Sequence, residues 1–141
     1  MMRDFALRFL AKRDGVSAVE FALVAPVLLI CLLGGVDMGR VVYQRADMES
    51  ALRAGAQYFM NGGDDLAKAE QVVSSSWTSK PSGASITAET FCMCGTTEHA
   101  CNMPCSDNSN PISYNSVSAS ATFPGILTSD SHNAAQSVRV R

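Results

Sequence analysis

The chain has 141 residues with a formal net charge of −2 at pH 7, and 47% of its residues are hydrophobic. This length accommodates at most one small globular unit in addition to a long helix. The small net charge, and the lack of a basic stripe interleaved with aromatic residues, argue against a nucleic-acid partner.

A short basic leader, residues 1–15, opens the chain and holds four basic residues against two aspartates. Residues 16–36 are then mostly apolar. As a helix rising ~1.5 Å per residue, they would span about 30 Å, the thickness of the hydrocarbon core of a bilayer. The positive-inside rule places the leader in the cytoplasm and the chain beyond Asp37 in the periplasm of a Gram-negative cell. We therefore expect a single-pass inner-membrane protein.

The apolar segment is longer than the core of a secretory signal peptide, and no A-x-A cleavage site follows it. An uncleaved single-pass membrane anchor is the alternative that these features leave open. Pro26 lies inside the segment and is expected to kink the helix. Cys31 is expected to be a small apolar filler, and Gly35 with Gly39 would allow another helix to approach closely.

The helix is predicted to continue outside the membrane, because residues 38–60 contain good helix formers and no proline. An apolar stripe recurs along it at spacings of three, four or seven residues. The stripe consists of Val41, Met48, Leu52, Ala56 and Phe59. A second, solvated face carries charges at i, i+4 spacing, namely Arg45, Glu49 and Arg53. Asn61-Gly62-Gly63 is a stop signal, so residues 37–62 form a periplasmic extension that ends near Met60.

Residues 63–141 are predicted to form a small α+β head with a second helix and about three antiparallel strands. The helix covers Asp64 to Trp77, with Asp64 or Asp65 as its cap and Trp77 as the largest core anchor. Alternating patterns predict three strands, over residues 84–91, 113–123 and 136–141.

The inward side chains of these strands are small. In the middle strand they are Val117, Ala119, Ala121 and Phe123. In the last strand Val138 and Val140 are expected to point inward, with Arg139 and Arg141 outward. A core built from such small residues needs additional support.

Four cysteines between the first two strands can supply that support: Cys92, Cys94, Cys101 and Cys105. In an oxidising compartment they are expected to form two disulfides that staple the loop. Because Cys92 and Cys94 are too close to bond each other, we favour Cys92–Cys101 with Cys94–Cys105. The crossed arrangement, Cys92–Cys105 with Cys94–Cys101, stays open.

Other chemistry is poorly supported by the sequence. The four thiols with His99 could bind zinc, but C-x-C-x6-C-x3-C is not the usual spacing, and a C-x-x-C redox motif is absent. Asp130-Ser131-His132 has the residue types of a catalytic triad, but a triad requires convergence in space rather than adjacency. No glycine-rich phosphate loop follows a strand. We therefore expect no enzyme, no metal and no cofactor.

Glu20 is the unusual residue of the apolar segment, where an ionised carboxylate costs about 2 kcal/mol or more unless it is paired. No lysine or arginine of the chain can reach it within the membrane. Cleavage after Gly15 would leave an α-amino group on Val16, about one turn away. An amine from a neighbouring subunit could pair with Glu20 and fix the axial register of stacked subunits. A protonated or snorkelling glutamate is the alternative.

Gly15, followed by Glu20-Phe21 and then ALVAPVLL, resembles the TadE-like minor pilins of the Flp (tight adherence, type IVc) pilus system. The resemblance rests on a glycine, a glutamate five residues later, an aromatic residue next and a proline within the span. It continues into RAGAQYF. The paired-cysteine loop and the strand that ends near Phe-Pro are also similar to that family.

This resemblance implies that a prepilin peptidase cuts between Gly15 and Val16. It also implies that Glu20, with Phe21 and Pro26, serves subunit alignment and assembly. The mature subunit would join or prime a thin pilus that acts in adhesion and biofilm formation. Its partners would be other Tad pilins, minor pilins and the inner-membrane assembly platform. Phe21 in place of the tyrosine of the major pilin motif, and the length of the chain, favour a pseudopilin.

Two other functions remain as alternatives to a pilin. The first is an uncleaved, membrane-anchored binding module whose periplasmic head recognises another envelope protein. The second is a periplasmic metal or thiol protein. Processing at Gly15 separates the first alternative from a pilin, and titration of free thiols with a measurement of metal content exposes the second.

Overall fold

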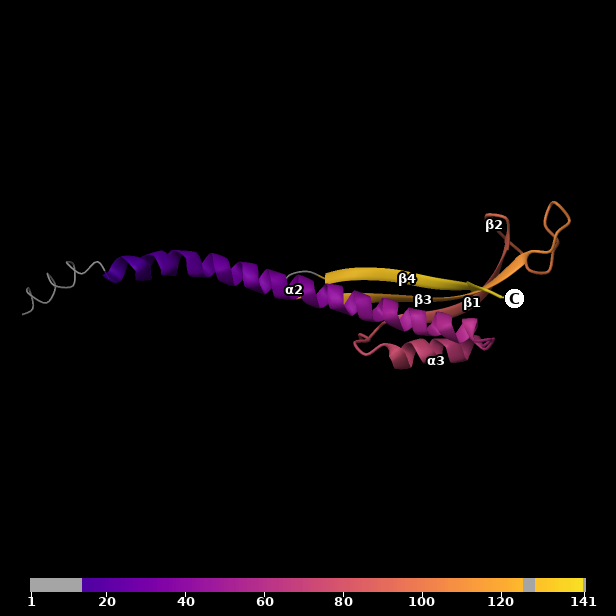
Figure 1. Cartoon of the computed structure of the whole chain (residues 1–141), viewed down its shortest axis with the longest axis horizontal. Helices are drawn as coiled ribbons and strands as arrows, with labels where there is room; N and C mark the ends of the chain where they lie inside the picture. Colours follow the sequence, from indigo (N-terminus) through magenta and orange to yellow (C-terminus); the bar gives the residue numbers. More distant parts are fainter. Residues whose placement is uncertain (1–13, 126–128, 141) are drawn as a thin grey trace, which may run out of the picture. The chain divides into compact units, whose positions relative to one another are not determined.

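The computed structural model describes residues 14–125 and 129–140. Two helices are followed by four strands (Figure 1): α2 (Asp14–Met60), α3 (Leu66–Ser76), β1 (Ser85–Cys94), β2 (Thr97–His99), β3 (Ile112–Pro124) and β4 (Ser129–Arg139). The chain divides into two compact units, with the boundary after Met38 inside α2. The first unit holds the N-terminal part of α2, and the second, from Gly39 onward, holds all the other elements.

α2 ends at the predicted stop signal through a defined cap. The N–H of Gly63 donates to the carbonyl of Tyr58, and the N–H of Gly62 donates to the carbonyl of Phe59, each at 3.0 Å. Gly62 has a positive φ of 90°. Together these features form a Schellman motif, which satisfies carbonyls left unpaired at the end of a helix. The chain can then turn directly into α3.

α3 begins where the sequence predicts it, after the aspartate pair. Asp65 is the N-cap, and its carboxylate accepts a hydrogen bond of 3.1 Å from the backbone N–H of Lys68. Ala69 and Val73 are buried, and Trp77 follows as the C-cap. The helix therefore presents the predicted apolar stripe to the rest of the second unit.

The four strands form one antiparallel sheet in the order β2-β1-β3-β4. Val117 in the middle of β3 pairs with Ala88 of β1 and with Gln136 of β4. Because side chains alternate along a strand, the buried apolar residues of β3 share the face that packs on the helices. This confirms the predicted face of Val117, Ala119, Ala121 and Phe123, all of which are buried.

The structure adds a fourth strand to the three that the sequence predicts. Gly95, with a φ of 65°, lets β1 turn back so that Cys94 pairs with Thr97 of the short strand β2. β4 is also longer than predicted, since it begins at Ser129 rather than at residue 136. Its polar N-terminal half lacks strand formers, and pairing with the long β3 overrides that weak local preference. Arg139 is exposed as predicted, whereas Val140 is also 43% exposed, and Arg141 lies outside the described residues.

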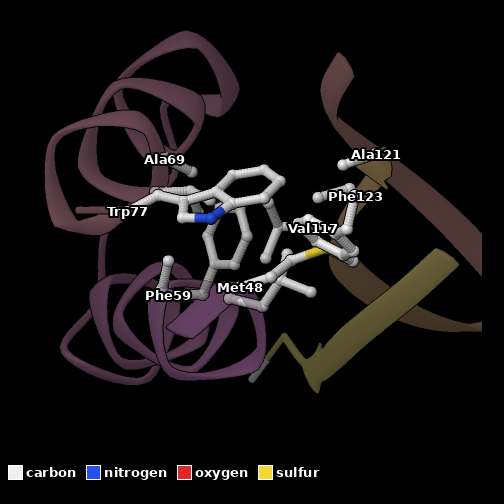
Figure 2. Packing of buried hydrophobic residues seen from close by; sticks show 11 residues of the cluster. Met48, Phe59, Ala69, Trp77, Val117, Ala121 and Phe123 are labelled. Carbon is white, nitrogen blue, oxygen red and sulfur yellow. The ribbon is translucent and has the colours of Figure 1, made fainter. Parts of the chain in front are cut away.

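The core lies between the two helices and one face of the sheet, as Figure 2 shows. α2 contributes Met48 and Phe59 to it. Trp77 packs edge-on against Phe123 of β3, with 6.5 Å between the ring centroids. The core is therefore closed by a few large side chains set among alanines, which explains why small inward residues are tolerated in the strands.

Polar contacts add to this core at its edges. The carboxylate of Asp47 on α2 accepts hydrogen bonds of 2.7 Å from both the N–H and the hydroxyl of Ser79. The carboxylate of Glu70 on α3 accepts a 2.8 Å hydrogen bond from the N–H of Ala88 in β1. Each contact ties a helix to a segment distant in sequence.

Gly55 is the point of closest approach between the layers. A Cβ atom at this position would lie 2.6 Å from a methyl group of Val73 on α3 and 3.1 Å from one of Val117 on β3. Both valines are fully buried and stiff at χ1. A glycine is therefore needed here because of packing, although glycine is a poor residue for the interior of a helix.

We expect Gly55→Ala to destabilise the second unit by about 1–3 kcal/mol, the usual cost of forcing an extra methyl group into a packed core. Gly39→Ala is the matched control, because nothing lies within 4 Å of a Cβ at Gly39. Thermal unfolding of the detergent-solubilised chain can be followed by the fluorescence of Trp77, the chain's single tryptophan. An unfolding midpoint for Gly55→Ala at or above that of Gly39→Ala would contradict this packing.

Candidate functional site

The N-terminal part of α2 exposes apolar side chains on all sides. The large hydrophobic residues from Val19 to Val36 are between 51% and 72% exposed. The most apolar 18-residue window of the helix has a mean hydropathy of 2.4. By length and composition this helix can cross a membrane, which is consistent with a membrane anchor.

The predicted processing site lies at the beginning of this helix. The backbone of Gly15 and Val16 is helical, since α2 begins at Asp14. The rest of the predicted leader, residues 1–13, lies outside the described residues. The peptide bond between Gly15 and Val16 therefore belongs to the first turn of α2.

Glu20, Phe21 and Pro26 are all exposed on α2, and Phe21 is 69% exposed. Within the described part of the chain, Glu20 has no ion-pair or hydrogen-bond partner for its side chain. At about 100° per residue, Pro26 lies on a different side of the helix from Glu20. The structure does not gather these residues into one cluster.

The four cysteines form two disulfides in the strand region. Cys92 bonds Cys101 and Cys94 bonds Cys105, with Cα atoms 5.2 Å and 5.6 Å apart. This is the pairing favoured from the sequence. Both bonds tie the end of β1 to the segment that follows β2. Cys31 is free and exposed on α2.

Hydrogen bonds hold the far part of this loop. Asp107 accepts bonds from the hydroxyl of Ser109 at 2.6 Å and from its backbone N–H at 3.1 Å. These bonds, that from the hydroxyl first, lower the pKa of Asp107 from its ordinary value. His99 lies 3.2 Å from the carbonyl of Pro104. The loop is thus a stapled and internally bonded appendage of the sheet.

The alternative zinc site does not form from these residues. The four cysteines are oxidised to disulfides, and so they offer no thiolate ligands. Among the residues that the structure describes, no group of three or more His, Cys, Asp or Glu side chains is placed to bind a metal.

The triad-like sequence Asp130-Ser131-His132 is also separated by the fold. β4 turns Asp130 and His132 toward the helices and Ser131 toward the opposite face, because side chains alternate along a strand. Asp130 forms an ion pair with Arg45 of α2, and His132 lies 3.9 Å from Glu49. These contacts hold β4 to α2 and do not assemble a nucleophile with a base.

The same contacts correct the prediction of a solvated charged face on α2. Arg53 is exposed as predicted, 3.7 Å from Glu49. Arg45 and Glu49 instead face β4, and the side chains of Arg45 and Asp130 are only 38% and 35% exposed. The sequence held one sign of these contacts, because Asp130 and His132 are two residues apart and would share one face of a strand. The last strand was predicted to begin only at residue 136, after both of them.

Comparison with known proteins gives a family match over the N-terminal segment. A family model described as TadE-like protein matches residues 15–57, which lie within α2. The resemblance to TadE-like proteins is therefore confirmed over this segment, and it associates the chain with the components of a Tad pilus system and with the membrane. No curated protein and no solved structure matches the chain.

The disulfides predict the number of reactive thiols. In the denatured, unreduced chain we expect one thiol, that of Cys31, to react with a maleimide, and all five cysteines to react after reduction. Intact mass spectrometry counts the added groups. The control Cys31→Ser should add none before reduction. Several additions to the unreduced chain would show that the loop is not stapled.

Proposed function

We propose that the chain is a structural minor pilin or pseudopilin, needed for the assembly of a Flp (Tad) pilus, and that it is not an enzyme. The observation that carries the proposal is that the TadE-like match coincides with α2, whose apolar N-terminal part is uncovered. Such a helix can be held first by lipid and then by the helices of other subunits. Its action is assembly rather than chemistry.

Glu20 supplies the specificity of this assembly. An unpaired carboxylate inside the hydrocarbon region costs about 2 kcal/mol or more, so there is a driving force to bring a cation to it. Cleavage after Gly15 creates that cation as the α-amino group of Val16. Residues four apart are neighbours on a helix surface, so the amine of the same chain or of an adjacent subunit can reach Glu20. Pairing between subunits fixes how far each helix slides along the next.

The remaining features fit the same arrangement. The leader lies in the cytoplasm, where a prepilin peptidase cuts it, and the second unit lies in the periplasm, where disulfides persist. The chain then resides in the inner membrane beside the assembly platform and other Tad pilins, and it enters the pilus on assembly. In the assembled pilus it serves adhesion and biofilm formation.

A second function is favoured by the independent core of the second unit. A membrane-anchored module with its own core, from Met48 to Phe123, could bind another envelope protein without ever being cleaved. The two functions differ in the fate of the leader.

We expect co-expression with the matching prepilin peptidase to yield a chain that begins at Val16, because the peptidase reads the glycine that precedes the cut. Intact mass and N-terminal sequencing of membrane-extracted protein measure this. Gly15→Leu should abolish cleavage, whereas Gly34→Leu, with open space at its Cβ, should not. Retention of the leader in the presence of an active peptidase would leave the uncleaved module as the function.

Glu20→Gln should insert into the membrane normally but enter pili at least about tenfold less, since loss of one partner of a buried ion pair costs about 3–5 kcal/mol. Quantitative immunoblots of the membrane fraction measure insertion, and those of sheared pili measure incorporation. Ser17→Ala, an exposed polar residue three positions away on the same helix, is the control. Normal incorporation of Glu20→Gln would refute the role of its charge.

A further inference from the structure

The sheet face opposite the core carries a continuous array of hydroxyl groups. Because side chains alternate along each strand, the residues between the buried positions of β3, and their partners on β1 and β4, share this face. We call it the hydroxyl face, and it comprises Ser85, Thr87, Ser116, Ser118, Ser120, Thr122, Ser131, Asn133 and Ser137.

The strand register orders these side chains into rows across the sheet. Ser120 pairs with Ser85 on one side and with Asn133 on the other. In the next row Ser118 pairs with Thr87 and with an alanine of β4. Rows repeat every second residue, about 6.7 Å apart along the strands. The face is therefore a regular, flat grid of small polar groups.

Two open depressions hollow this grid, with volumes of about 390 Å³ and 160 Å³. Ser120 and Asn133 line both of them, so the two depressions are continuous across the middle of the face. An open trough of this kind suits an extended chain better than a compact small molecule, which is usually enclosed on most sides.

Several polar groups of the face have unused hydrogen-bonding capacity. The hydroxyls of Ser85 and Ser120 lie 2.6 Å apart, and those of Thr87 and Ser118 lie 2.8 Å apart. Each pair uses one donor and one acceptor, and the hydroxyl of Ser118 also donates to the carbonyl of Thr87 at 3.5 Å. Lone pairs therefore remain in both pairs, and a second hydroxyl proton remains in the pair of Ser85 and Ser120. Ser116 is only 7% exposed as a residue, but its hydroxyl still reaches solvent and can bond to water or to a ligand.

An aromatic pair borders the face at one end. The rings of Phe91 and Tyr114 are stacked, with 5.4 Å between centroids and 15° between planes. Tyr114 pairs with Arg139 on β4, and Glu89 pairs with Ser116 in the adjoining row. Aromatic side chains provide apolar surface next to the hydroxyls. Within the described residues, the charged side chains on this side of the sheet, Glu89 and Arg139, lie at this end.

The composition of the face selects among ligand classes. Nucleic acids and anionic lipids require clustered lysine or arginine, whereas this side of the sheet carries one arginine within the described residues, Arg139 at its aromatic end. Interfaces between proteins are depleted of serine and alanine and rich in large apolar side chains at their centre, the reverse of what is found here. An uncharged polyol matches a neutral array whose hydroxyls both donate and accept. The apolar faces of sugar rings can pack against the aromatic side chains of Phe91 and Tyr114.

We propose that the hydroxyl face binds a neutral polysaccharide, an extended chain of uncharged sugar units lying along the trough. This binding role goes beyond the assembly role of α2 and does not depend on it, because every residue of the face lies in the second unit.

The test uses the full chain in a detergent without a sugar headgroup, since such headgroups would compete. Affinity electrophoresis compares its mobility in gels containing dextran, hydroxyethylcellulose or the anionic polymer alginate. The test variant combines Thr87→Val, Ser118→Ala and Ser120→Ala. The control variant combines the same changes at exposed residues elsewhere, Thr96→Val, Ser76→Ala and Ser82→Ala. The unfolding midpoint of each variant, from Trp77 fluorescence, shows whether the fold is kept.

We expect at least one neutral polymer to retard the wild-type chain and the control variant. We expect its affinity for the folded test variant to fall about tenfold or more, because three hydrogen-bonding groups are lost. Should the test variant fail to fold, Thr87→Val alone is compared with Thr96→Val. Three outcomes would overturn the proposal: no retardation by either neutral polymer, retardation by alginate alone, or equal retardation of test and control variants.

Discussion

The second unit depends on how closely three elements approach at Gly55. Without a side chain there, α2 can come within contact of Val73 on α3 and Val117 on β3 at once. The core cluster combines four alanines with large apolar side chains. The large side chains include Met48, Leu52 and Phe59 of α2 as well as Trp77 and Phe123. Close backbone packing and large side chains together give a dense core.

The disulfides and the ion pairs act where this core ends. Cys92 lies near the end of β1, is buried and stands outside the main core cluster, and its bond to Cys101 ties this end of the strand to the following loop. A loop of about ten residues closed by a disulfide is worth roughly 2–3 kcal/mol through the unfolded state. At β4, the ion pair between Arg45 and Asp130 likewise holds the strand to α2. The thin core is therefore supported at separate places by covalent and ionic links.

Patterns local in sequence were sufficient for much of this molecule. The end of α2 at Gly62-Gly63, the cap at Asp65 and the inward face of β3 each depend on residues close together in the chain, and each was predicted. The start of β4 and the strand β2 were not, because they depend on pairing with distant strands. The packing role of Gly55 was not predicted, since only the folded state brings Val73 and Val117 to it. Glu20 was identified by its cost in lipid, and its pairing with a cation stays a prediction.

The hydrogen bond from Ala88 to Glu70 has a consequence for the two edges of the sheet. The N–H of Ala88 points away from β3, so the carboxylate of Glu70 occupies the outer side of β1 at its middle, and β2 covers its end. Within the described residues, no strand or side chain does the same along β4, whose eleven residues pair with β3 on one side only. Exposed edge strands recruit further strands through their free backbone groups. Of the two edge strands, β4 with eleven residues therefore offers another polypeptide a longer row of free backbone groups than β2 with three.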